Sequence, residues 1–195
     1  MRQLLRACLR DYYPGQCEHW RLDKDEAGRP VLQGDGAPDI NWSHSRGRLA
    51  LAIAGSGRVG VDLEQIDDRR RWWAVARRYF HAEEVQWLQQ LPDEQRRDAF
   101  FDLWTLKEAH TKARGATMAT SMASTAFDLN RPRRIATRFS SPGQAFRLWQ
   151  PEPGWRLALC QLATGPKAPR IALFGTTAEV ETGVAEQALL ATSEP

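Results

Sequence analysis

Hydrophobic residues follow two different periods along the chain, and the period changes where turn-forming residues occur. Over residues 3–10, leucines recur at helical spacing among arginines, which predicts a short amphipathic helix. Over 49–53 and again over 59–63, apolar side chains occupy every second position, as in half-buried strands. Because a Gly-Ser-Gly turn at 55–57 separates these two runs, we predict that they form a β-hairpin.

The middle of the chain has helical periodicity, and the remainder returns to short extended segments. Helices are predicted over residues 70–79, 83–91 and about 93–113. Short strands are predicted at 124–129, 144–150 and 155–162, followed by a short helix and a frayed end beyond about 176. The order of strands, helices and strands indicates an α+β fold.

The composition is ordinary for a soluble globular protein and excludes several classes. The 195 residues include 42 % hydrophobic and 26 % charged residues, enough to bury a core without disulfides. Cys8, Cys17 and Cys160 lack metal-ligand spacing and are expected to be reduced thiols. No apolar run approaches the roughly 20 residues that cross a bilayer, and arginines interrupt the leucines near the N-terminus. We therefore expect a cytoplasmic protein.

The cationic residues are unusually biased towards arginine. Of 27 basic residues only four are lysines, at positions 24, 107, 112 and 167. Two of these lie five residues apart in one predicted helix. One interpretation is that this segment needs a compact ammonium and not a planar guanidinium; the alternative is chance in a small sample.

The first motif that carries chemistry is the run Gly-Val-Asp-Leu-Glu at 60–64. On a strand, Asp62 and Glu64 share one face, about 7 Å apart, while Val61 and Leu63 point to the core. Two neighbouring carboxylates resist ionisation unless a cation lies between them, and Mg²⁺ suits such a pair together with phosphate oxygens. The alternative is an exposed acidic strand face, neutralised by arginines that follow it.

The second motif is the segment 104–112. On a helix, Trp104, Glu108 and Lys112 follow at intervals of four residues and form one stripe. This stripe could supply a third carboxylate for a metal ion and an ammonium beside a phosphate. Alternatively, it is a solvated helix face with one salt bridge worth a few tenths of a kcal/mol.

The third motif is Asn-Trp-Ser-His-Ser at residues 41–45. His44 lies between Ser43 and Ser45, and the three side chains together could bind a phosphate by hydrogen bonds. A lone histidine before a strand is more often simply a polar surface residue. The motif alone leaves both interpretations open.

Taken together and in this order, the three motifs resemble those of the 4'-phosphopantetheinyl transferase superfamily, in the branch that includes surfactin-synthetase activators. The family pattern is roughly N-[LIV]-S-H-S, then [VI]-G-[VI]-D-[LIV]-E, then W-x-x-K-E-[SA]-x-x-K. This sequence has the corresponding residues at 41–45, 59–64 and 104–112, with Gly-Arg-Pro at 28–30 upstream. The resemblance covers about residues 4–162.

The resemblance implies an α+β fold made of a pseudo-twofold pair of similar α/β halves, with coenzyme A between them. Residues 1–58 would form a shortened N-terminal half, because the family has about 40 more residues before the Asn-x-Ser-His motif. Residues 59–176 would form the C-terminal half with the metal and catalytic residues, and 177–195 a tail. A second departure is Thr117, where the family usually has the second glycine of a Gly-x-Gly loop that here begins at Gly115.

The resemblance also implies a reaction and a site. A holo-[acyl-carrier-protein] synthase would move 4'-phosphopantetheine from coenzyme A to a serine of an acidic apo carrier protein, releasing 3',5'-ADP. Mg²⁺ would be held by Asp62, Glu64 and Glu108. The catalytic residues would be Glu108, Lys112 and Glu84, of which either glutamate could deprotonate the serine. Coenzyme A would contact Arg2, Arg29, Ser43, His44, Lys107 and Lys112.

Two other interpretations remain open from the sequence. A degenerate homologue could bind coenzyme A or a carrier protein without transferring anything. The arginine runs and paired tryptophans at 72–73 could alternatively serve nucleic acid, although such aromatic residues more often belong to a core. We expect a monomer without nucleic-acid or membrane contacts.

Overall fold

A computed structural model describes residues 1–67, 69, 71–130, 134–138, 143–162 and 189–192. The N-terminal elements are α1 (Arg2–Tyr12), the short 3₁₀ helix η1 (Cys17–His19), β1 (Arg21–Lys24), β2 (Pro30–Gln33), β3 (Asp39–Ser45), β4 (Arg48–Ala54) and β5 (Arg58–Gln65). The remaining elements are α2 (Trp72–Tyr79), α3 (Ala82–Gln90), α4 (Asp93–Arg114), α5 (Met118–Ser121), β6 (Ala126–Asp128), β7 (Ala136–Arg138), β8 (Gln144–Trp149), β9 (Trp155–Leu162) and β10 (Leu189–Thr192).

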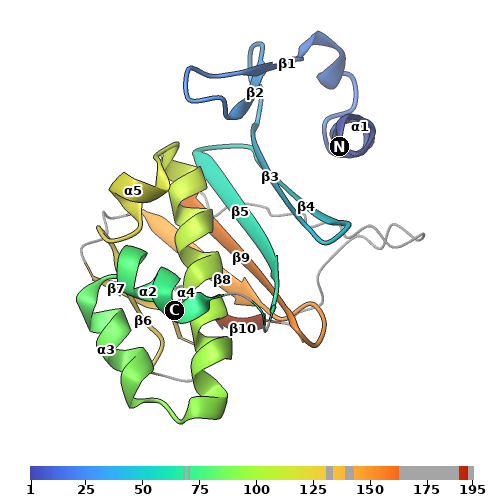
Figure 1. Ribbon diagram of the computed structural model, residues 1–195. Helices are drawn as coiled ribbons and strands as arrows, with labels where there is room; N and C mark the ends of the chain where they lie inside the picture. Colours follow the sequence, from blue (N-terminus) through green and yellow to red (C-terminus); the bar gives the residue numbers. More distant parts are fainter. Residues whose placement is uncertain (68, 70, 131–133, 139–142, 163–188, 193–195) are drawn as a thin grey trace.

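The larger layer is an antiparallel sheet in the order β10-β8-β9-β5, with the long helix α4 packed along one face (Figure 1). Helix α4 buries Phe100, Phe101, Leu103 and Leu106 completely, because the sheet lies on one side of it and α2 and α3 on the other. It ends at Gly115, whose φ of 64° is the left-handed conformation that glycine adopts without strain. None of the described helices is long and apolar enough to cross a membrane.

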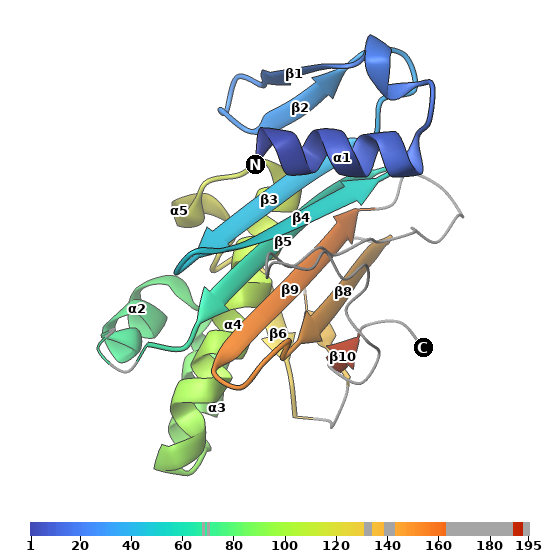
Figure 2. The same ribbon diagram turned by 90° about the vertical axis from the view of Figure 1, so that its right-hand side faces the viewer.

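The smaller layer is the hairpin β3–β4, with α1 lying across it (Figure 2). Leu5 and Leu9 of α1 pack with Ile40, Leu51 and Ile53 of the two strands. The two-residue turn at 46–47 has positive φ at both positions, as in the turns that match the twist of an antiparallel hairpin. The α+β class is confirmed, and it takes the form of two helix-on-strand layers of unequal size.

The predicted hairpin between 49–53 and 59–63 is wrong in its pairing. The chain does reverse at residues 55–57, but the ladder partner of β4 is β3, and that of β5 is β9. Alternation of apolar residues shows that a segment is a strand, yet it does not select the neighbour. Here the tight turn at 46–47 favours the β3–β4 pair.

The other predicted elements are mostly confirmed. Helices α1, α3 and α4 and strands β6, β8 and β9 lie within two residues of the expected positions, and α2 begins at Trp72. The short elements α5 and β7 were not predicted. The tail was expected to be a helix and a frayed end, but Leu189–Thr192 form a strand that pairs with β8; the rest of the tail lies outside the described residues.

One histidine of α4 is enclosed by the core. The ring of His110 lies 5.6 Å from that of Phe146 and 6.4 Å from that of Phe127, both edge to face. Its Nε2 atom is buried without a hydrogen-bond partner among the described residues. Burial, with smaller contributions from Arg114 and Lys107, lowers the pKa of His110 to about 4.

Replacing His110 with phenylalanine should therefore reduce the acid sensitivity of the fold. An unfolded histidine has a pKa near 6.5, so the unfolded state binds more protons between about pH 6.5 and pH 4. The free energy of unfolding consequently falls as the pH drops through this window. Urea denaturation near pH 7 and pH 4.5 should show a loss that is about 1–2 kcal/mol smaller in His110→Phe. Identical losses of unfolding free energy in the wild type and the variant would contradict this prediction. Any effect of the substitution on packing cancels, because the two pH values are compared within each protein.

Candidate active site

The site depends on direct backbone contact between α4 and β5. A Cβ atom added at Gly60 would lie 2.1 Å from the carbonyl oxygen of Ala109 and 2.4 Å from the backbone nitrogen of Ala113. Real Cβ atoms do not approach backbone this closely, so only glycine allows the helix to rest on the strand here. Asp62 and Glu64 follow on the same face of β5 and therefore also point towards α4.

The predicted stripe on α4 is present and faces β5. The indole Nε1 of Trp104 donates to Oε1 of Glu64 at 2.8 Å, and the Lys112 ammonium contacts Oδ1 of Asp62 at 2.6 Å. Glu108 lies between these two contacts on the helix, and it lines the same pocket as both acids. All three acidic residues expected from the sequence therefore line one pocket.

Lys112 is held by three acceptors. Its Nζ donates to Oδ1 of Asp62, to Oγ of Ser43 at 3.1 Å and to the carbonyl oxygen of Val61 at 3.2 Å. The Ser43 hydroxyl donates in turn to Asp62 at 2.9 Å. The Lys112 side chain is still 28 % exposed, whereas the Asp62 side chain is 6 % exposed. One face of the lysine therefore remains accessible to a ligand.

These residues surround a pocket of about 370 Å³. The exposed His44 lies in its lining, as do Trp42, to which the sequence assigned no contact, and Leu63, which the sequence placed in the core. The lining residues are Trp42, Ser43, His44, Asp62, Leu63, Glu64, Glu108 and Lys112. A pocket lined by three acids together with an ammonium and an imidazole suits a phosphate ligand that brings a cation with it.

The donor set fits a hard cation shared with a ligand. Oδ2 of Asp62 is buried and has no hydrogen-bond partner among the described residues, which is costly for a carboxylate oxygen. Over the same described part of the chain, no three His, Cys, Asp or Glu side chains form a ready metal cluster. Mg²⁺ usually takes only one or two carboxylates and completes its shell with phosphate oxygens and water. The arrangement therefore suits an ion that arrives with a phosphate.

Two expected site residues lie in the core instead. Lys107 and Glu84 are each 1 % exposed and form an ion pair at 2.7 Å. The other two ammonium protons of Lys107 go to the carbonyl oxygens of Met122 and Thr125. Desolvation raises the pKa of Glu84 and lowers that of Lys107, while their pairing opposes both shifts. Neither can touch a ligand in the pocket, so we assign them a structural role.

The two expected arginines also lie elsewhere. Arg29 is buried and forms two parallel hydrogen bonds with Asp39, at 2.7 and 2.6 Å, so it has no free face for a nucleotide. Arg2 is exposed on α1 and lines a different cavity, of about 550 Å³, that shares no residue with the pocket above. The resemblance placed both beside coenzyme A, and the structure does not bring either to the pocket.

Comparison with known proteins agrees with the motifs. The family model of the 4'-phosphopantetheinyl transferase superfamily matches residues 58–160. The 4'-phosphopantetheinyl transferase HetI of Nostoc sp. is 36 % identical over 121 residues, covering 58 % of this chain and 49 % of its own length. The 4'-phosphopantetheinyl transferase gsp of Aneurinibacillus migulanus is 30 % identical over 141 residues, covering 71 % of this chain and 57 % of its own.

The solved structures include a holo-(acyl-carrier-protein) synthase from Bacillus anthracis in complex with coenzyme A (3',5'-ADP). It is 14 % identical with a TM-score of 0.47, covering 56 % of this chain and 98 % of its own. On the family match, this chain belongs to the 4'-phosphopantetheinyl transferase superfamily. It spans about half the length of the curated relatives named above.

Gly60→Ala should destabilise the protein strongly, because the new methyl group meets helix backbone that cannot move by rotamer change. Overpacking of this kind costs about 1–3 kcal/mol or more. Gly55→Ala is the matched control, since its Cβ would meet only the tip of Tyr13, at 3.2 Å; it should stay within about 0.5 kcal/mol of the wild type. Urea denaturation measures both. Equal stability of the two variants would show that α4 does not rest on β5 at this point.

Lys107→Met should lower stability and leave coenzyme A affinity unchanged. Removing one partner of a buried pair costs about 3–5 kcal/mol, and the double variant Lys107→Met/Glu84→Gln should lose less. Lys24→Met, at an exposed lysine of β1, is the control. Denaturation and calorimetric titration separate the two roles. If Lys107→Met has wild-type stability but a tenfold weaker coenzyme A affinity, Lys107 belongs to the ligand site and not to the core.

Proposed function

We propose that this chain is a 4'-phosphopantetheinyl transferase that moves the phosphopantetheine arm of coenzyme A to a serine of an apo carrier protein, releasing 3',5'-ADP. The observation that carries the proposal is the state of Asp62. One of its oxygens is held by Lys112 and Ser43, while the other is buried without a partner among the described residues, in a pocket that Glu64 and Glu108 also line. A carboxylate held in this way favours a cation.

The residues of the pocket would have different roles in a phosphoryl transfer. Asp62, Glu64 and Glu108 would hold Mg²⁺, which when bound supplies charge neutralisation at the pyrophosphate. Lys112 and the exposed His44 would bind and orient the phosphates by charge-assisted hydrogen bonds. Ser43 keeps Lys112 in place and contributes a hydroxyl at the edge of the pocket.

Glu108 is the candidate base, because Glu84 lies in the core. The serine hydroxyl of the carrier attacks the β-phosphorus of coenzyme A and passes its proton to Glu108. The bond from that phosphorus to the oxygen of 3',5'-ADP breaks, and the charge develops on the departing phosphate. Positioning and charge neutralisation dominate such reactions.

An acidic carrier protein suits the charge near the end of β5. Arg71, Arg77 and Arg78 are exposed on α2 and just before it. The nucleic-acid alternative is not favoured by the paired tryptophans, since Trp72 packs 5.9 Å from Phe100, in the core. That the partner is acidic, that the protein is a monomer and that it works in the cytoplasm remain predictions.

Mass spectrometry of an apo carrier incubated with this protein, coenzyme A and Mg²⁺ tests the function. The carrier should gain the mass of phosphopantetheine, and Asp62→Asn and Glu108→Gln should each lower the rate by about 10²–10³ or more. Glu94→Gln is the matched control, an exposed glutamate in the first turn of the same helix. If the wild type binds coenzyme A tightly but no carrier gains mass, the chain is a binding homologue and not a transferase.

A further inference from the structure

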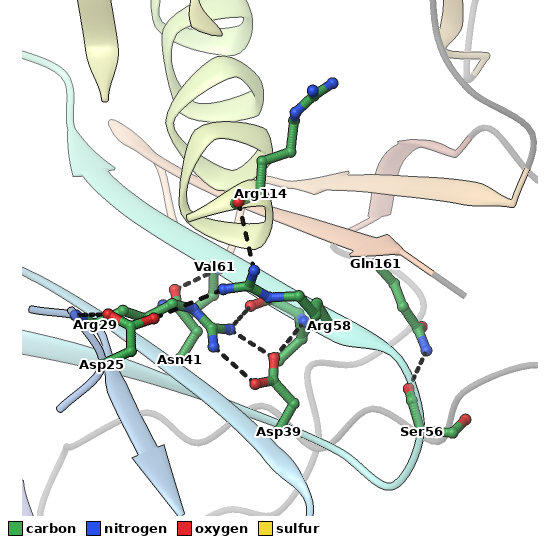
Figure 3. A network of polar contacts seen from close by, with 10 residues as sticks. Asp25, Arg29, Asp39, Asn41, Ser56, Arg58, Val61, Arg114 and Gln161 are labelled. Carbon is green, nitrogen blue, oxygen red and sulfur yellow. Dashed lines mark hydrogen bonds and ion pairs between the residues drawn. The ribbon is translucent and has the colours of Figure 1, made fainter. Parts of the chain in front are cut away.

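The strands β3 and β5 run side by side in parallel, and side chains connect them instead of a backbone ladder. Oδ2 of Asp39 accepts from the N–H of Val59 at 2.7 Å, and Oδ1 of Asn41 accepts from the N–H of Val61 at 2.9 Å (Figure 3). Each link joins residues twenty positions apart. The hydroxyl of Ser45 extends the series to Gln65 at 3.4 Å, with the same offset.

The carbonyl groups on the same edge of β5 are also satisfied by side chains. The carbonyl oxygen of Val59 accepts from Arg29 at 2.7 Å, and that of Val61 accepts from Lys112 at 3.2 Å. The opposite edge of β5 is paired with β9. Buried backbone groups must find partners, so Asn41 and Lys112 together complete the peptide groups of Val61.

The hydrogen bonds from β3 side chains go to backbone N–H groups of β5 at Asp39 and Asn41, but at the active site the bond goes to a side chain. By the offset of twenty, Ser43 lies opposite position 63, yet its hydroxyl donates to the carboxylate of Asp62 and accepts from Lys112. Asn41 fixes the strand pair just before this point and Ser45 just after it. Because strand side chains alternate between faces, a slip of one residue would turn Ser43 away from Asp62.

The Arg29–Asp39 pair braces this arrangement. The Arg29 side chain is 6 % exposed and that of Asp39 is 17 % exposed, and the two parallel hydrogen bonds fix their mutual orientation. Asp39 Oδ2 accepts both from Arg29 and from the N–H of Val59. The pair therefore ties the start of β2 and β3 to the start of β5, one step before Asn41.

We propose that Asn41, braced by Arg29 and Asp39, is a positioning residue that sets the register of β3 against β5 and so holds Ser43 and Lys112 on Asp62. The proposal rests on the proposed transferase function for its kinetic consequence. It gives a role to the first residue of the Asn-Trp-Ser-His-Ser motif, for which the sequence suggested none. Asn41 acts through its neighbours and touches no reacting atom.

Hydrogen exchange of the wild-type protein is the first test, because it requires no variant. The amide protons of Val59 and Val61 should be among the protected ones, although they point away from the β9 ladder. Fast exchange at Val61 would overturn the proposal outright. Two nearly isosteric variants then separate the acceptor from the volume: Asn41→Leu removes the oxygen, and Asn41→Asp keeps it.

Asn41→Leu should lose protection at Val61 and lower kcat about tenfold to a hundredfold, as expected when reacting groups are displaced by about 1 Å. KM for coenzyme A should change less than kcat. Asn41→Asp should lie between Asn41→Leu and the wild type in both readouts. Gln161→Leu is the matched control, because it removes a buried side-chain-to-backbone bond of β9, to the carbonyl oxygen of Ser56, that lies outside this series; it should keep kcat within about threefold of the wild type.

Wild-type kcat in Asn41→Leu, or no recovery in Asn41→Asp, would overturn the proposal. A failure of the proposed transferase function can be told apart from a failure of this proposal. The hydrogen-exchange pattern does not depend on transfer, so it should be the same even if the wild type transfers nothing. In that case the Lys112 ¹⁵Nζ resonance, one of only four lysine signals, reports the same contact. It should shift in Asn41→Leu and move less in Gln161→Leu; an unchanged resonance in Asn41→Leu would reject the positioning role.

Discussion

The contact between α4 and β5 at Gly60 determines the rest of the site. Because no side chain intervenes, the helix backbone lies directly on the strand, and Trp104 and Lys112, two turns apart on α4, reach the acids of β5. Lys112 has a short distance to span to Asp62, as Trp104 has to Glu64. The chemistry of the pocket therefore follows from a packing distance, which a single methyl group would change.

The acceptors around the two lysines of α4 explain why these positions have lysine while the chain uses arginine almost everywhere else. Lys107 donates to two carbonyl groups and one carboxylate, and Lys112 donates to a carbonyl, a hydroxyl and a carboxylate. Three separate acceptors around one point suit a compact ammonium with three donors. Arg29 donates two parallel hydrogen bonds to one carboxylate and another to the carbonyl oxygen of Val59, and the planar fork matches the carboxylate better.

The sequence predicted those parts of the structure that depend on local patterns. Alternation placed Asp62 and Glu64 on one face of a strand, and helical spacing placed Trp104 and Lys112 on one stripe; both arrangements are observed. It did not predict that Lys107 points into the core, because its partner Glu84 lies 23 positions away and the helix face alone does not identify it.

The hydrogen bonds between β3 side chains and the backbone of β5 also could not be predicted from the sequence. An asparagine or an aspartate in a strand gives no sign that it replaces a backbone acceptor of the neighbouring strand. The resemblance to the family suggested a ligand contact for Arg29, but the pairing with Asp39 is a property of this chain's own fold. Periodicity shows on which face of a strand or helix a side chain lies, but it does not identify a partner that is distant in the sequence.

The position of β5 between β3 and β9 has a consequence for the protein as it is synthesised. Strand β3 precedes β5 in the chain, so its side chains can reach one edge early, whereas β9 begins only at Trp155. Until the ribosome has released residues 155–162, the apolar strand β5 has an unpaired edge, which is a site for aggregation. A nascent chain of this protein should therefore need a chaperone most during translation of the 89 residues between the two strands.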